Sequence, residues 1–503
     1  MKVSVVKDEA CYPKVPFHPS ECYPEYPFPS KYTSKLKNPV YDAVRQAFYL
    51  LGLDSENFGT SSWNPLRDLV KEGSKIIIKP NFVNHYNPAS DERTYFQALV
   101  SQGAVIRPIL DYVLLAAKDK YYELTIADLP MQGADFQVLC RESGVESILR
   151  FIQGNGYAKG EIKFLDLRDY RLRAARSGAV IGKVKLSGDP LGYLTVNLGE
   201  NSSLVPLERY SHLFRVSDYT DDAAVEMHCN GNHHYILPRT ILESDLIINV
   251  PKLKVHRKAG VTLSLKNLVG VIGYKGCLPH FRAGSTDAGG DEYPIPTVIN
   301  SMRSKYDFAL RNMGRTVWGL ARPLGRILLR LDQRLHRDNP LAHIISGDWY
   351  GNDTVWRMVH DLNRIIFHAD AKGILHDEPQ RRYLTIVDGI VGGECEGPLK
   401  PKPVKTGLIV VGFDPIAVDV TCAQLMGLDW RKIPQFARYN SKQRYPFSRF
   451  NGDTKEINLV ASGIPYNGLL ESTKPVHTFE PASGWKGHIE LSGLEPHGGS
   501  GSS

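Results

Sequence analysis

Short apolar runs rich in β-branched residues recur along the chain and alternate with helical patterns. The runs are KIIIK at 75–79, LTIA at 124–127, LIINV at 246–250, LTIV at 384–387 and GLIVVG at 407–412. Helical periodicity covers 44–51, 106–117, 354–367 and 417–426. Continuous apolar strands that alternate with helices are typical of a parallel sheet buried on both faces. The sequence therefore predicts an α/β fold, with a mostly parallel sheet, helices on both faces, and insertions.

Composition divides the chain into five segments. They are a Pro- and aromatic-rich arm at 1–40, a first part of the α/β core at 41–300 with a β-rich insertion at about 163–245, a basic amphipathic helical segment at 301–345, the second part of the core at 346–465, and a tail at 466–503 that ends in the linker-like GGSGSS. The aromatic side chains of the arm need a surface to cover. We expect that surface to be the protein itself or a second subunit, so the arm is compatible with a homodimer.

The basic segment carries seven arginines between residues 307 and 337, mostly spaced as one helical face would place them, together with an apolar complement. Two interpretations stay open. The segment docks on an anionic membrane surface or an acidic partner, or it is an exposed helix pair with a solvated basic face.

Charge and cysteine spacing exclude several classes of protein. A net charge of +7 on 503 residues is mild, and no nucleic-acid-binding motif is present, so nucleic acid is not an expected partner. The seven cysteines include no C-x-x-C pair, so local spacing predicts no Fe–S cluster. The N-terminal residues lack the apolar core of a signal peptide, and no run of about 18 apolar residues occurs. We expect a cytoplasmic protein, either free or peripheral at a membrane.

Candidate site residues follow the predicted strands, where ligands bind in parallel sheets. Lys79 and Asn81 come after one strand and Asp128 after the next. The densest group is Lys252, Lys254, His256 and Lys266, which lie within fifteen residues in an apolar context. Buried lysines need anions, because removing an ammonium from water costs several kcal/mol. The cluster therefore predicts an anionic ligand, and it favours base or Schiff-base chemistry by a lysine of lowered pKa.

Two further groups could take part. Asp388 precedes the glycine-rich stretch that contains Glu394 and Glu396, where backbone N–H groups could approach an anion and carboxylates could bind a cation. Arg357 and Asp361 share a helical face at i, i+4 and could form an ion pair.

Several of these stretches together resemble one known family. IIIKPNFV, TIADLPMQGADF, IINVPKLKVHRKAGVTLSLKNLVG, NDTVWRMVHDLNRI, IVDGIVGGECEGPLKPKP and FDPIAVDVTCAQLMGLD look like the DUF362 family, a domain of unknown function, over roughly residues 75–440. The ferredoxin-type 4Fe–4S module of some members is missing here. The resemblance implies that the matching positions meet in one cleft. These positions are Lys79, Asn81, Asp128, Lys252, Lys254, His256, Lys266, Asn267, Asp388, Gly397, Pro398, Asp414 and Asp419.

The leading hypothesis is an enzyme that acts on a small anionic substrate, such as a hydroxy acid, a sugar acid or a phosphorylated metabolite. Proton abstraction next to a carboxylate, as in an epimerase, isomerase or lyase, suits these groups. We assign catalysis to His256, Lys266 and Lys252, substrate binding to Lys79, Asn81, Lys254, Asn267, Arg357 and Gly397, and a divalent metal ion to Asp128, Asp388 and Glu396. The alternatives are a metal-dependent transferase or hydrolase for phosphorylated or lipid-linked sugars at a membrane, and a non-enzymatic protein that binds an anion or a partner.

Overall fold

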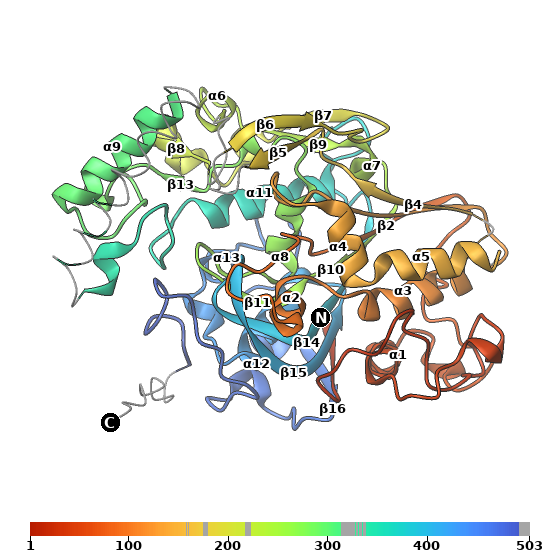
Figure 1. Ribbon diagram of the computed structural model, residues 1–503. Helices are drawn as coiled ribbons and strands as arrows, with labels where there is room; N and C mark the ends of the chain where they lie inside the picture. The colour runs from red at the N-terminus through yellow and green to blue at the C-terminus, as the bar shows by residue number, and fades with distance from the viewer. Residues whose placement is uncertain are drawn as a thin grey trace.

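A computed structural model shows a central mixed sheet with helices on both faces (Figure 1). It describes residues 1–156, 158, 160–174, 180–216, 223–312, 327, 330, 334 and 339–491. The sheet runs in the order β16 (Asn458–Ser462), β1 (Lys2–Lys7), β15 (Lys400–Gly412), β14 (Arg382–Glu396), β10 (Leu246–Val250), β2 (Ser74–Pro80), β3 (Tyr122–Asp128) and β4 (Glu161–Asp166). β11 (Lys252–His256) joins the distal half of β14, and β12 (Gly260–Val261) pairs with β11.

Side-chain alternation along the strands explains why the sheet is covered on both faces. In β2, Ile76 and Ile78 enter one hydrophobic core, and Ile77 between them enters the other. The first core also takes in α1 (Pro39–Leu51), α3 (Gly103–Ala116) and α5 (Val145–Gly154). The second takes in α8 (Leu263–Asn267), α11 (Val355–His368) and α12 (Pro415–Leu425). Both faces of an apolar strand are therefore used, and the predicted α/β fold with a mostly parallel sheet is confirmed.

The remaining described helices are short or peripheral. They are α2 (Arg93–Leu99), α4 (Phe136–Ser143), α6 (Ala224–Met227), α7 (Arg239–Leu242), α9 (Val298–Asn312) and α13 (Pro434–Ala437). No single helix of the described part of the chain is long and apolar enough to cross a membrane. The bent pair α2 and α3 meets that test by length and composition, and almost every residue of α3 is buried.

Two strands depart from the predicted pattern. The stretch from Asp388 to Glu396 is the second half of β14, which forms an antiparallel hairpin with β15. The glycine-rich stretch is therefore a paired strand rather than the anion-binding segment expected from the sequence. Its glycines allow close packing instead, because a Cβ at Gly392 would lie 2.6 Å from the ring of Phe479. The N-terminal residues form β1 between β15 and β16, so the arm begins only after Lys7.

The arm folds back on the same chain. Phe17, Tyr26 and Phe28 are buried in the core that contains α1 and α3. The region of the predicted β-rich insertion contains β5 (Tyr170–Ala174), β6 (Val180–Lys185), β7 (Tyr193–Asn197), β8 (Phe214–Arg215) and β9 (His234–Pro238). These strands form two-stranded sheets, β5–β6, β7–β9 and β8–β13 (Phe281–Arg282), at the top of Figure 1.

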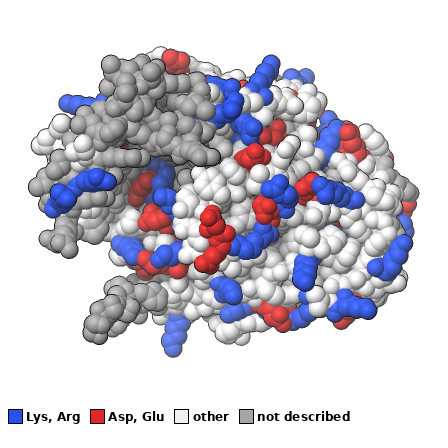
Figure 2. Space-filling view, in the orientation of Figure 1, with Lys and Arg blue, Asp and Glu red and all other residues white. Residues whose placement is uncertain are grey.

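Most of the basic segment at 307–337 lies outside the described residues, so its docking on a membrane stays a prediction. On the described surface in view, basic and acidic side chains are interspersed (Figure 2). The dense group of lysines predicted from the sequence, Lys252, Lys254 and Lys266, lies inside the molecule and not on this surface.

A lysine-lined cavity at the strand ends

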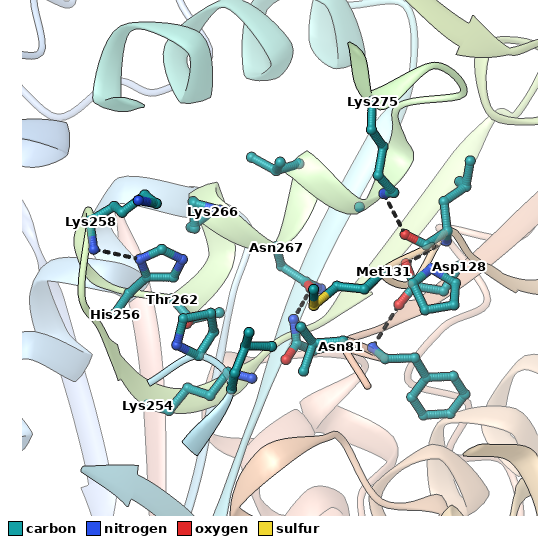
Figure 3. A pocket seen from close by; sticks show the side chains of 18 of the residues that line it. Asn81, Asp128, Met131, Lys254, His256, Lys258, Thr262, Lys266, Asn267 and Lys275 are labelled. Carbon is teal, nitrogen blue, oxygen red and sulfur yellow. Dashed lines mark hydrogen bonds between the residues drawn. The ribbon is translucent and has the colours of Figure 1, made fainter. Parts of the chain in front are cut away.

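A cavity of about 140 Å³ opens at the carboxyl ends of β2 and β3, beside β11 and α8. Two histidines line it, and its charged side chains comprise six cations and a single carboxylate. The cations are Lys79, Lys254, Arg257, Lys258, Lys266 and Lys275, the carboxylate is Asp128, and the histidines are His256 and His280. Figure 3 shows Lys275 and Asp128 at one end, His256 and Lys258 at the other, and the Asn81–Asn267 pair between them.

The carboxylate is already used by one lysine. Lys79 Nζ donates to Asp128 Oδ1 at 2.8 Å and to the carbonyl oxygen of Pro80 at 2.9 Å. Asp128 Oδ2 accepts the N–H of Phe82 at 2.7 Å. Parallel pairing of β2 with β3 brings these two strand ends together, as the sequence predicts. The pair is buried and forms the floor of the cavity, so the cavity lining offers no further carboxylate to the other five cations.

Two other lysines donate to backbone oxygens, and a third donates to a carboxylate. Lys254 Nζ lies 2.6 Å from the carbonyl oxygen of Leu99, and Lys275 Nζ lies 2.8 Å from that of Leu129. Burial lowers the pKa of Lys254 well below its ordinary value, helped by the charges of Lys252 and Lys266. Burial also lowers the pKa of Lys275 to about 7. Lys258 has a carboxylate partner, Asp348, at 2.6 Å.

Lys266 differs from the others. Among the described residues it has no hydrogen-bond or ion-pair partner, although it lines the cavity from α8. Burial, and then the charges of Lys258 and Lys79, lower its pKa to about 8. A lysine in this position is stabilised by a bound anion or by loss of its proton.

The two histidines present opposite ring nitrogens. His256 Nδ1 accepts the backbone N–H groups of Lys258 at 3.0 Å and Ala259 at 3.3 Å, so the neutral ring carries its proton on Nε2. His280 Nδ1 lies 2.9 Å from the carbonyl oxygen of Leu278, so that nitrogen donates and Nε2 keeps its lone pair. Burial, and then the charge of Lys266, lower the pKa of both histidines well below 6.5. The cavity therefore holds one imidazole donor and one imidazole acceptor.

Two polar atoms in the cavity wall have no partner among the described residues. They are Asn81 Oδ1 and the hydroxyl oxygen of Thr262. Asn81 Nδ2 is fixed by Asn267 Oδ1 at 2.7 Å, which leaves the amide oxygen unpaired. Buried polar atoms are nearly always paired, so both oxygens point to a polar ligand.

The helix that carries Lys266 and Asn267 is held from outside the cavity. Asp419 of α12 accepts the N–H groups of Ser264 at 2.7 Å and Leu265 at 2.9 Å, and thereby caps the first turn of α8. Asp414 caps α12 itself, accepting the N–H groups of Ile416 and Ala417. The two aspartates thus position the helices α8 and α12 and do not contact the cavity.

Two of the predicted site residues form a separate buried group. Lys252 Nζ lies 3.1 Å from Asp388 Oδ2 and 2.7 Å from the hydroxyl of Tyr12, which donates to Asp388 Oδ1 at 2.6 Å. None of the three lines the cavity. Lys252 is two residues before Lys254 on β11, and a register irregularity separates them. The same strand face therefore serves a structural ion pair at its start and the cavity further along.

The other predicted residues also lie away from the cavity. Arg357 pairs with Asp353 at 3.1 Å rather than with Asp361, whose carboxylate binds Arg364 at 2.9 Å, so the predicted i, i+4 pair is wrong. Gly397 does not line the cavity, although the next residue, Pro398, does.

The three carboxylates proposed as metal ligands are not gathered together. Asp128 binds Lys79, Asp388 binds Lys252, and Glu396 is exposed and accepts the N–H of Ser483. The described residues contain a different group with metal-ligand geometry, Glu394, Cys395 and Glu480, outside the cavity.

Lys258 and Lys275 were not singled out from the sequence. Lys258 follows His256 by two residues and could have been counted with the cluster. Lys275 begins the short 3-10 helix Lys275–Cys277, and no local pattern distinguishes it from a surface lysine.

Fold and site together define an α/β protein with a lysine-lined cavity at the carboxyl ends of parallel strands. Residues 200–424 match the model of the DUF362 family, a domain of unknown function. The matched range includes β11, α8 and the loops that supply Lys254 to His280, whereas Lys79 and Asp128 come from the preceding part of the chain. A search of curated proteins found no match.

Proposed function

We propose that this protein is an enzyme that binds a small carboxylate-bearing substrate in the cavity and transfers a proton next to that carboxylate. The observation that carries the proposal is the arrangement of Lys266, His256 and His280 around one cavity: an unpartnered cation, an Nε2–H donor and an Nε2 acceptor. An anion-binding protein needs the lysines, but it does not need two histidines set in opposite tautomers.

Charge and size define the substrate class. Six cations line the cavity. Lys79 is paired with Asp128, and Arg257 and Lys258 are paired with Asp348. Lys254, Lys266 and Lys275 have no carboxylate partner among the described residues, so a bound anion is favoured. The cavity volume of about 140 Å³ lies below the roughly 300–1,000 Å³ of pockets for drug-sized ligands. A hydroxy acid or oxo acid of a few carbons suits both the positive charge of the lining and the small volume of the cavity.

Each histidine has a distinct role in this proposal. His256 donates from Nε2 to the oxygen on which negative charge develops, as an oxyanion hole does. His280 accepts the proton at Nε2. Burial, and then the charges of Lys266 and Lys258, lower its pKa. A bound anion offsets those charges, so substrate raises the pKa of His280 toward the range of a useful base.

Hydrogen–deuterium exchange tests the proposal. The protein is incubated in D2O with lactate, malate, pyruvate or 2-oxobutyrate, and loss of the C–H signal next to the carboxylate or carbonyl is followed by NMR. We expect wild-type protein to exchange at least one of these acids above the rate without protein. His280→Gln should abolish exchange and keep affinity, and His256→Gln should slow it. The exposed His212, changed to Gln, is the matched control. Tight binding without exchange would make this a binding protein instead.

A further inference from the structure

Lys266 is the amine in this cavity that is free to react. Lys79 is held by Asp128, Lys258 by Asp348, and Lys254 and Lys275 by backbone carbonyls. Within the described residues, Lys266 alone of these five lysines lacks such a partner. A lysine that only binds an anion is better positioned when a protein oxygen also accepts a hydrogen bond from its ammonium group.

We propose that the Nζ of Lys266 forms an imine with the carbonyl carbon of a small oxo acid bound in the cavity. This inference rests on the proposed function and narrows its substrate to an acid that carries a ketone or aldehyde. The orphan hydroxyl of Thr262 and the Nε2–H of His256 line the same cavity and offer hydrogen-bond partners for the carbonyl oxygen.

The lowered pKa of Lys266 favours the reaction, because more of its side chain is unprotonated near neutral pH. With a pKa of about 8, about one Lys266 side chain in ten is unprotonated at pH 7, against about one in several thousand for an ordinary lysine. The charges of Lys258 and Lys79 in the cavity wall lower the pKa of Lys266. The charge of Lys266 in turn lowers the pKa values of Lys254, His256 and His280.

The step balances without an added reactant. Lys266 gives one proton to Nε2 of His280, the neutral amine attacks the carbonyl carbon, and the C=O electron pair moves to oxygen. A proton then moves from the attacking nitrogen to that oxygen and gives the neutral carbinolamine. The carbinolamine then loses its hydroxyl group, which takes the proton back from His280 and leaves as water. The nitrogen lone pair forms the C=N bond. Ammonium and ketone thus become iminium and water, with no net change in protons.

The iminium links this step to proton transfer. A cationic C=N group withdraws electrons from the neighbouring carbon and makes its C–H more acidic. His280 Nε2, free again after water leaves, can accept that proton. One lysine and one histidine therefore supply the electron sink and the base.

Borohydride trapping tests the imine. The full-length protein is incubated with pyruvate, 2-oxobutyrate or 2-oxoglutarate at pH 8, sodium borohydride is added, and intact mass and peptide masses are measured. We expect a mass increase equal to the acid less one oxygen, on the peptide that contains Lys266. The yield should rise from pH 6, reach half its maximum near pH 8 and level off at about pH 9–10, following deprotonation of Lys266.

Variants separate this inference from the proposed function. Lys266→Arg keeps the charge and removes the nucleophile, so the adduct should disappear while the thermal stabilisation by oxalate persists. Lys118→Arg, on the surface, should keep the adduct. An absent adduct with all three acids, or an undiminished adduct in Lys266→Arg, overturns the imine. Deuterium exchange that survives in Lys266→Arg also overturns it and leaves the proposed proton transfer standing.

Discussion

The absence of a side chain at Gly270 is as important to the cavity as the lysines themselves. A Cβ at this position would lie 2.7 Å from Lys79 Nζ and 2.8 Å from Asp128 Oδ1. Its backbone conformation is one that any residue can adopt, so space alone requires the glycine. The buried ion pair on the cavity floor therefore depends on the 3-10 helix Leu268–Val271, which follows α8, as well as on the two strands.

Gly270→Ala should separate the Lys79–Asp128 pair, lower the free energy of unfolding by about 1–3 kcal/mol, and weaken binding of oxalate. Urea unfolding and isothermal titration measure the two effects. Gly133→Ala is the control, since a Cβ there meets nothing within 4 Å. Wild-type oxalate affinity in Gly270→Ala would show that the ion pair does not shape the cavity.

The sequence predicts cavity residues best where chemistry follows a strand end. Lys79, Asn81 and Asp128 meet because parallel strands end at the same edge. Strand alternation also predicts one face for Lys252 and Lys254, but it does not say how far along that face the cavity extends. Tyr12, which pairs with Lys252 from 240 residues away, leaves no local trace in the sequence.

At the scale of elements, Asp414 and Asp419 position the helices of the site without lining the cavity. Asp419 on α12 holds the start of α8, and α8 presents Lys266 and Asn267. Burial raises the pKa of Asp419 well above its ordinary value, while the two backbone N–H groups lower it. The five-residue helix α8 cannot be stable alone, so its direction depends on this cap.

Asp419→Asn keeps the shape but leaves one oxygen to accept two N–H groups, so α8 should lose one of its capping bonds. We expect a loss of about 0.5–2 kcal/mol in unfolding free energy and weaker oxalate binding. Asn38→Ala, which removes the cap of α1 in the other core, should cost similar stability without changing oxalate affinity. Equal effects of both variants on affinity would contradict a specific role of Asp419.

The arm is tied to the core by Tyr12. Tyr12→Phe removes the hydroxyl that bridges Lys252 and Asp388, and we expect a loss of about 1–3 kcal/mol, with earlier proteolytic cleavage in the arm. Oxalate affinity should stay unchanged, because the three residues lie outside the cavity lining. The exposed Tyr121, changed to Phe, controls for loss of a hydroxyl. A change in affinity would mean that the Lys252–Asp388 pair communicates with the cavity.

Most core elements are predictable from periodicity, within a few residues. The run 246–250 coincides with β10, and the helical pattern 354–367 differs from α11 by one residue at each end. The hairpin of β14 and β15 is not predictable in this way, because its distal half pairs glycines, prolines and charged residues rather than apolar ones. Backbone pairing and packing against Phe479 hold that stretch in strand form.

For the whole molecule, the buried lysines of the cavity lower the free energy of unfolding, and the size of this effect depends on pH. The folded-state pKa of Lys266 is about 8, below its ordinary value of 10.5. Between these pH values the folded protein binds fewer protons than the unfolded chain, so this lysine makes stability rise with pH. Lys275, with a pKa of about 7, acts in the same direction from a lower pH.

Lys266→Met should therefore be more stable than wild type at pH 7, because it removes a charge that burial disfavours. Its advantage should shrink as the pH rises from about 8 to 10.5, where wild-type protein loses the same charge. Thermal melts across this range, with the surface variant Lys118→Met as control, measure the difference. Saturating oxalate should reverse the order at pH 7, since a bound anion compensates Lys266 in wild type alone. A constant difference across the pH range would show that Lys266 keeps its charge and its ordinary pKa in the folded protein.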